Sequence, residues 1–332
     1  MTQLIVSPSP HIRSRNTTAL IMKDVIIALI PAMIAGIIFF GIRALIITLV
    51  CVISCVVFEY LARRVMKKDK TISDFSAVVT GILLAFNLPV SIDLWIAVLG
   101  SFFAIVIVKQ LFGGIGQNFV NPAIAARIIL FVSFATQMTN WVKPFYYQSI
   151  KFNGFFGFVS SLFGSFTNFD RIDAIATATP LTTGIQSADT LNLFLGNVGG
   201  CIGEVSALAL IIGGVYLVIR KVISPVVPLT FIGTVFVFTF ILGENPLNHI
   251  FSGGLMLGAI FMATDYSTTP VTIKGKLIFA FGCGVITVLI RVFGTYPEGV
   301  SFAILFMNLL TPLIDKGTRK KPFGAKKVGE SK

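Results

Sequence analysis

Charged side chains are scarce in this sequence, because Asp, Glu, Lys and Arg make up only 12% of its 332 residues. A soluble domain usually carries about 25% charged residues. With 55% hydrophobic residues, the chain lacks the polar groups that would cover a water-facing surface. These proportions exclude a soluble enzyme, a secreted disulfide scaffold and a disordered protein, and they predict a membrane protein with several spans.

Histidine and cysteine are also rare, with two and four copies. Cys51 and Cys55 lie four residues apart in an apolar run, where free cysteines usually act as small buried hydrophobes. No pair has CxxC spacing, and no Cys/His set has the spacing of metal ligands. The chain is therefore expected to hold no metal, and an iron–sulfur centre would come mainly from other proteins.

Apolar runs dominate the rest of the sequence. Runs of about 17–25 residues are the length that crosses a bilayer as a helix. Ten candidate spans are marked, some of them short, at 24–42, 44–62, 74–88, 92–112, 121–134, 204–219, 225–242, 249–264, 276–293 and 299–314.

Basic residues test this count, because Lys and Arg concentrate in the loops that stay in the cytoplasm. Assigning loops alternately to the two sides places twenty basic residues on one side and five on the other. This asymmetry predicts ten spans with both termini cytoplasmic. It also explains the net charge of +12 without nucleic acid. The first 23 residues are polar and show no cleavable signal peptide.

The spans divide into five and five, and an odd number per repeat turns the second copy upside down. We predict an all-α polytopic protein of two inverted five-helix repeats with short or broken third and fifth helices. Tilted or kinked spans are the alternative. The predicted parts are a cytoplasmic segment 1–23, a first repeat 24–134, an external segment 135–203, a second repeat 204–314 and a basic cytoplasmic tail 315–332.

A glycine-rich segment between the fourth and fifth spans is the first candidate site. It reads Gly-Gly-Ile-Gly-Gln-Asn-Phe-Val-Asn-Pro-Ala over 113–123. Glycines let a flat ring approach the backbone, while Asn118 and Asn121 offer amide groups and Pro122 suits a first helical turn. The segment lacks the spacing of nucleotide-binding glycine loops. A ligand site and a plain loop with an Asn helix cap both remain open.

Acidic residues in or beside the spans are the second group of candidates, because a charge at membrane depth is costly and often functional. They are Asp24, Glu59, Asp74, Asp265 and Glu298. Asp74 and Asp265 flank the third span of each half, so they are candidates for an ion path. Helix capping and topology are the alternative roles.

The third candidate is Asp-Ala-Ile-Ala-Thr-Ala-Thr-Pro-Leu at 173–181, in the predicted external segment. Its composition alone is that of an ordinary Thr/Ala turn before a proline. Two threonine hydroxyls among small residues would also let a bulky group lie against the backbone.

Four blocks together resemble one family, that of the D subunit of the Rnf electron-transport complex and the related B subunit of the sodium-translocating NADH:quinone reductase. The blocks are GGIGQNFVNPA, DAIATATPL, FMATDYSTTPVTIKGKLIF and GVITVLIRVFGTYPEGVSFAILFMNLLTPLID. They occur in order, so the resemblance covers about residues 10–323.

The resemblance implies two flavins. In the family, a threonine in a D-x-x-[ST]-G-A-T type motif carries FMN through a phosphoester bond made by a flavin transferase. Asp173 matches the acidic position and Thr179 the acceptor, while Ala176 and Thr177 depart from the Ser-Gly pair and leave Thr177 as a minor rival.

The second implied flavin is riboflavin, bound without a covalent bond near Asn118 and Asn121, with Lys109 as a further contact. Riboflavin is neutral and lacks phosphate, so its transfer into a bilayer costs less than that of FMN.

The resemblance therefore implies a subunit of an ion-translocating oxidoreductase in a bacterial or archaeal cell membrane. It would relay electrons rather than catalyse alone, with other Rnf subunits, Na⁺ or H⁺ and membrane lipid as partners. Two alternatives are a flavin-free solute transporter or channel and a purely structural membrane subunit.

Overall fold

A computed structural model describes residues 17–69, 71–145, 176–177, 189–294 and 298–319. Within these ranges, four helices are long and apolar enough to cross a membrane, and five shorter apolar helices accompany them. The fold is mostly helical, which agrees with the predicted polytopic class.

The first half of the bundle contains two long helices followed by shorter ones. In chain order, its elements are α1 (Thr18–Phe40), α2 (Ile42–Val65), the 3-10 turn η1 (Ile72–Asp74), α3 (Ser76–Phe86), α4 (Leu94–Phe102), the π-helix η2 (Phe103–Gln110) that continues α4, and α5 (Pro122–Ser133).

The second half begins after a short helix, α9 (Thr190–Leu195). Its elements are α10 (Ala207–Ile219), α11 (Val226–Ile241), α12 (Pro246–Phe251), α13 (Leu255–Leu257), the π-helix η7 (Gly258–Met262), α14 (Ile273–Phe293) and α15 (Val300–Thr318).

One helix begins before its predicted start, and the third span of the second half is broken, as the prediction of a short or broken third helix allowed. Helix α1 begins at Thr18, six residues before the predicted start, because the Thr17 side chain caps it by accepting a hydrogen bond from the Leu20 amide. The predicted span 249–264 is broken into α12, α13 and η7, and Gly253 in the break has a φ of +63°.

The expectation of a short fifth helix in the second half is wrong. Helix α15 has 19 residues, because it continues through Pro312 to Thr318. Its counterpart α5 is short, with 12 residues.

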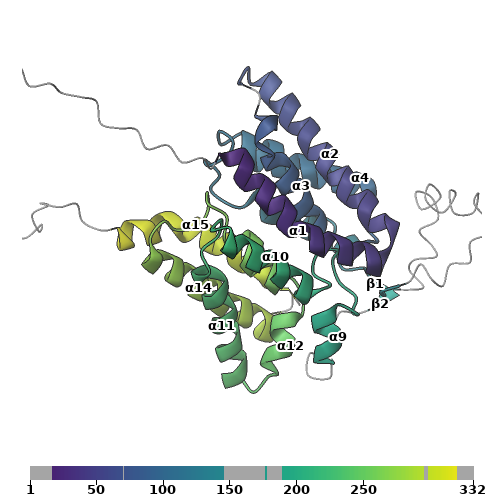
Figure 1. Ribbon diagram of the computed structural model, residues 1–332, viewed down its shortest axis with the longest axis vertical. Helices are drawn as coiled ribbons and strands as arrows, with labels where there is room; N and C mark the ends of the chain where they lie inside the picture. Colours follow the sequence, from purple (N-terminus) through teal and green to yellow (C-terminus); the bar gives the residue numbers. More distant parts are fainter. Residues whose placement is uncertain (1–16, 70, 146–175, 178–188, 295–297, 320–332) are drawn as a thin grey trace, which may run out of the picture.

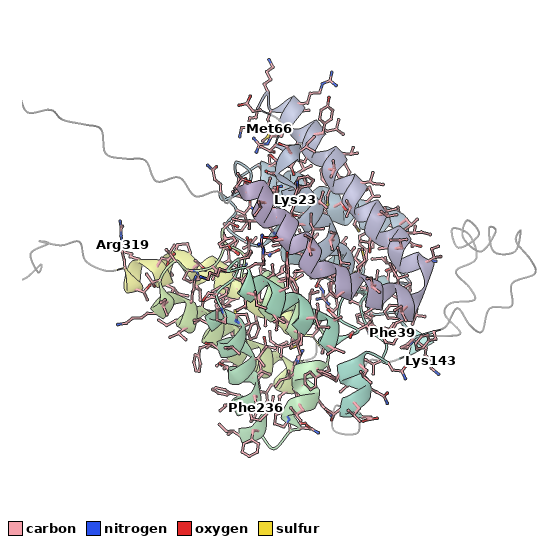
Figure 2. All side chains as sticks on the ribbon, viewed as in Figure 1. Lys23, Phe39, Met66, Lys143, Phe236 and Arg319 are labelled. Atoms are coloured by element: carbon pink, nitrogen blue, oxygen red, sulfur yellow. The ribbon has the colours of Figure 1, made fainter. Side chains whose placement is uncertain are left out.

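The connections gather at two ends of the bundle. Lys23 and Met66 lie toward one end, while Phe39 and Lys143 lie toward the other (Figure 2). At the second end, the Phe145 amide donates to the Phe39 carbonyl at 2.7 Å. Connections that are distant in sequence therefore meet at the same end of the bundle.

The described part of segment 135–203 packs against that second end. It includes α6 (Ala135–Met138) and two short antiparallel strands, β1 (Trp141–Val142) and β2 (Ala176–Thr177). The Ser91 hydroxyl donates to the Asn140 carbonyl at 2.5 Å just before β1. The predicted apolar stretch 153–166 lies outside the described residues.

The two halves meet along α1 with α10 and along α5 with α15, and Figure 1 shows α10 beside α1 at the centre of the molecule. Asp24 of α1 accepts a hydrogen bond from the Tyr216 hydroxyl at 3.1 Å and pairs with Arg220 at 3.2 Å. This hydrogen-bonded carboxylate raises the pKa of Arg220, which lies at the C-cap of α10, beyond the helix. One core of apolar side chains runs through both halves.

Candidate functional site

A cavity lies between the two halves, beside the first turns of α3 and α5. Its empty space amounts to about 770 Å³ when the open solvent at its mouth is included. Its walls are mainly apolar and come from both halves of the chain, including Met22, Val25, Val79, Leu83, Leu217 and Phe261. Such walls can cover the faces of a flat ring.

Lys109, a predicted pocket residue, supplies a buried cation to the cavity wall. Its ammonium group pairs with Glu59 of α2 at 2.7 Å and donates to the Ser76 hydroxyl at 2.6 Å. Glu59 is fully buried and also accepts a hydrogen bond from Thr71 at 2.7 Å. The carboxylate thus neutralises Lys109 and holds it against the first turn of α3.

Asn121 lines the cavity and also caps α5, as the sequence allowed. Its side-chain oxygen accepts hydrogen bonds from the amides of Ala123 at 3.0 Å and Ile124 at 3.4 Å. Its amide nitrogen donates to the Met262 carbonyl at the end of η7, at 3.4 Å. Because Pro122 has no N–H, the first turn of α5 leaves few donors for an anion.

Asn118 differs from Asn121 in having an unused acceptor. The residue is buried in the cavity wall, and its side-chain oxygen has no hydrogen-bond partner among the described residues. An unpaired buried amide oxygen costs free energy. A ligand with an N–H or O–H group at this point would remove that cost.

Asp74 and Asp265 have similar local geometry, because each is followed two residues later by a serine that it binds. Asp74 accepts from the Ser76 amide at 2.9 Å and from the Ser76 hydroxyl at 2.6 Å. Asp265 accepts from the Ser267 amide at 3.4 Å and from the Ser267 hydroxyl at 3.0 Å. Both serines line the cavity, as does Asp265 itself, whereas Asp74 reaches it through Ser76.

These residues fit a neutral ligand better than an anionic one. Lys109 is paired with Glu59, and the Asp265 carboxylate would repel a phosphate. Asn118 offers a hydrogen-bond acceptor. Among the described residues, no group of three or more His, Cys, Asp or Glu side chains is arranged to hold a metal ion.

Of a second buried polar cluster, the sequence singled out only Glu298. Arg127 of α5 donates to the Asn87 side chain at 2.6 Å, pairs with Glu204 at 3.0 Å, and forms a hydrogen-bonded ion pair with Glu298. Glu298 also accepts from the Gly254 amide at 3.0 Å. An arginine inside an apolar span was the signal that could have revealed this cluster.

The predicted sites therefore divide into two groups. One cavity is lined by Lys109, Asn118, Asn121 and Asp265. The sequence did not predict that Asp265 lies beside the other three. Thr179 and Asp173 lie outside the described residues.

The apolar helices define a polytopic helical membrane protein with a mainly apolar cavity between its two halves. A family model described as the NQR2, RnfD, RnfE family matches residues 5–324. The chain belongs to this family, as its sequence blocks predicted.

Several relatives align over nearly all of both chains. The D subunit of the Na⁺-translocating ferredoxin:NAD⁺ oxidoreductase complex of Acetobacterium woodii is 47% identical over 98% of this chain and 96% of its own. The D subunit of the proton-translocating ferredoxin:NAD⁺ oxidoreductase complex of Clostridium ljungdahlii is 41% identical over 97% and 96%. The D subunit of an ion-translocating oxidoreductase complex of Escherichia coli is 34% identical over 97% and 99%.

Proposed function

We propose that this protein is the membrane subunit of an ion-translocating ferredoxin:NAD⁺ oxidoreductase complex and relays electrons through bound flavin. Family membership and the names of the relatives support the role in the complex. One of these relatives is named for Na⁺ and another for protons, so the proposal includes both ions.

The unpartnered oxygen of Asn118 is the observation that carries the flavin proposal. Riboflavin has ring N–H and ribityl O–H groups, and it lacks the phosphate that the surroundings of Asp265 disfavour. Bound flavin would supply reversible one- and two-electron redox chemistry. Asn118 would accept a hydrogen bond, and the apolar walls would exclude water from the ring.

Lys109 would make the bound flavin easier to reduce. A fixed positive charge favours the addition of an electron nearby, and its pairing with Glu59 moderates that effect. Asn121 would keep the wall in place, because both ends of its amide are already bound within the protein.

We further propose that Thr179 carries a second flavin, FMN, through a phosphoester bond. Support comes from the order of the family blocks and from the match of Asp173 and Thr179 to the family motif. The bond would be made by a separate flavin transferase. Thr177, two residues earlier, is the rival acceptor.

The proposed arrangement in the membrane has ten spans in two inverted repeats, with both termini cytoplasmic and the Thr179 segment external. The paired contacts of α1 with α10 and of α5 with α15 support such a repeat. Asp74 and Asp265 are the proposed carboxylates of the Na⁺ or H⁺ path. Other Rnf subunits and membrane lipid would surround the bundle.

The decisive experiment counts covalent and noncovalent flavin in the purified complex, produced together with the flavin transferase. Thr179→Ala should abolish the fluorescent band of this subunit in a denaturing gel and leave the extractable flavin unchanged. Asn118→Leu should do the reverse, reducing extractable riboflavin while the fluorescent band remains.

Two controls complete this test. Thr177→Ala should keep the fluorescent band, and Gln117→Ala, a change at an exposed neighbour of Asn118, should keep the riboflavin. A fluorescent Thr179→Ala band would disprove the FMN site. A colourless wild-type subunit that moves solute by itself would favour the transporter alternative.

A further inference from the structure

Arg63 is a buried cation that the proposed function does not use. It lies in the last turn of α2 and is only 9% exposed. Its Nε atom is buried and has no hydrogen-bond partner among the described residues. A buried guanidinium without a counterion is costly, so this position favours an anionic ligand.

Gln110, at the end of η2, faces the same point. It is 1% exposed, and neither atom of its amide group has a hydrogen-bond partner in the described part of the chain. A Cβ atom added at Gly114 would lie 3.4 Å from Arg63 Cζ and 3.8 Å from Gln110 Oε1. The two side chains therefore converge on one glycine from two different elements.

The backbone between these side chains is shaped by its glycines. Gly114 has a φ of +104°, a conformation that disfavours a side chain. The amides of Gly113 and Gly114 donate to the carbonyls of Gln110 and Lys109, at 3.1 and 3.0 Å. Because these amides are used, donors for a ligand would come from the side chains of Arg63 and Gln110.

The surroundings indicate the chemistry of that ligand. The site lies where the apolar helix α2 ends, and Met66 marks this end in Figure 2. Large apolar side chains beside it are exposed, with Val65 at 81% and Leu111 at 61%. Arg64 and Lys67 are also exposed there. Apolar and basic groups together at a helix end match the headgroup region of an anionic membrane.

We propose that Arg63 and Gln110 bind the phosphate of an anionic phospholipid at the surface of the membrane. The planar guanidinium can donate two parallel hydrogen bonds to phosphate oxygens, and the Gln110 amide can donate a third. The acyl chains would lie along the exposed apolar side chains at the end of α2. This site is separate from the flavin cavity, because neither residue lines that cavity.

Native mass spectrometry of the delipidated, purified complex tests this proposal. Phosphatidylglycerol or phosphatidylcholine is added, and adducts on the released subunit are counted. The wild type should retain one phosphatidylglycerol at least tenfold better than phosphatidylcholine. Arg63→Gln should lose this preference, and Arg64→Gln, a change of an exposed neighbour, should keep it.

A second variant guards against a general loss of structure in Arg63→Gln. Gln110→Glu provides Arg63 with an internal carboxylate, so the complex should assemble normally while the lipid adduct is lost. Adducts that persist in both Arg63→Gln and Gln110→Glu would overturn the proposal, as would equal loss in Arg64→Gln. If millimolar inorganic phosphate displaces the adduct, the site binds free phosphate and not lipid. If a partner protein occupies this surface in place of lipid, the ligand of Arg63 is a protein carboxylate, and the lipid proposal is wrong.

Discussion

At the scale of single residues, the pairing of Lys109 with Glu59 decides whether the cavity wall is stable. Both side chains are almost completely buried, and their charged atoms lie 2.7 Å apart. Removing one partner of a buried ion pair usually costs about 3–5 kcal/mol, because the other charge is left without compensation. Replacing both partners with neutral groups can cost much less.

We therefore expect Glu59→Gln to lower the thermal stability of the purified complex strongly, and Glu59→Gln with Lys109→Met to recover most of the loss. The free energies of the two single changes and the double change form a cycle, which measures the coupling between the two residues. Additive effects of the two single changes would contradict the pairing.

At the scale of helices, close approach depends on Gly81 in α3. A Cβ atom at this position would lie 2.7 Å from the Val52 Cα atom of α2. Small residues commonly let helices approach closely in membranes, where packing rather than hydrophobic burial drives association. Because α3 carries Ser76 and Thr80 to the cavity wall, its distance from α2 also sets the shape of the cavity.

Gly81→Ala should destabilise the complex by about 1–3 kcal/mol, since the clash is with backbone that cannot turn away. Riboflavin content should fall as well. Gly233→Ala in α11 is the matched control, because a Cβ atom there meets nothing within 4 Å. Thermal melting and flavin extraction measure both effects, and equal melting of the two variants would refute this account of the α2–α3 contact.

Apolar run length predicted most of the helices, because it reports a local property of the chain. A short or broken third helix was predicted in the second half, but run length did not locate its break between α12 and α13, since 249–264 was marked as one span. It also ended the last helix too early, because Pro312 and the polar residues after 314 resemble a terminus, whereas α15 continues to Thr318.

The candidate site was predictable only in part, for a similar reason. Asn118 and Asn121 lie in one motif, so the sequence identified them together, whereas Lys109 was added only through the family resemblance. Glu59 and Lys109 are 50 residues apart, and no periodicity indicates which distant residues meet. The same holds for the Arg127 cluster, whose partners come from segments on either side.

At the scale of the whole molecule, polar contacts connect the two halves at different levels. Asp24 of α1 joins Arg220 after α10, and Asn121 joins Met262 beside the cavity. Arg127 joins Glu298 near the start of α15. Polar groups of both halves therefore meet at each of these levels, and the proposed coupling of electron and ion movement would act across these contacts.

Asp74→Asn and Asp265→Asn test this coupling with little structural change. Asparagine keeps a side-chain oxygen for the hydrogen bonds to Ser76 and Ser267 but removes the charge. We expect each change to slow ion-coupled turnover by about tenfold, equivalent to about 1.4 kcal/mol. Flavin content should be unchanged, and Asp93→Asn, a change between α3 and α4 away from the cavity, should have no effect on turnover.

The measurement is ferredoxin-dependent NAD⁺ reduction together with ²²Na⁺ uptake, or with acidification when protons are the coupling ion, in vesicles that contain the whole complex. Slower uptake with intact flavin would separate the ion path from cofactor binding. Uptake at the wild-type rate in both variants would remove Asp74 and Asp265 from the ion path, and their role would then be to hold Ser76 and Ser267 in the cavity wall.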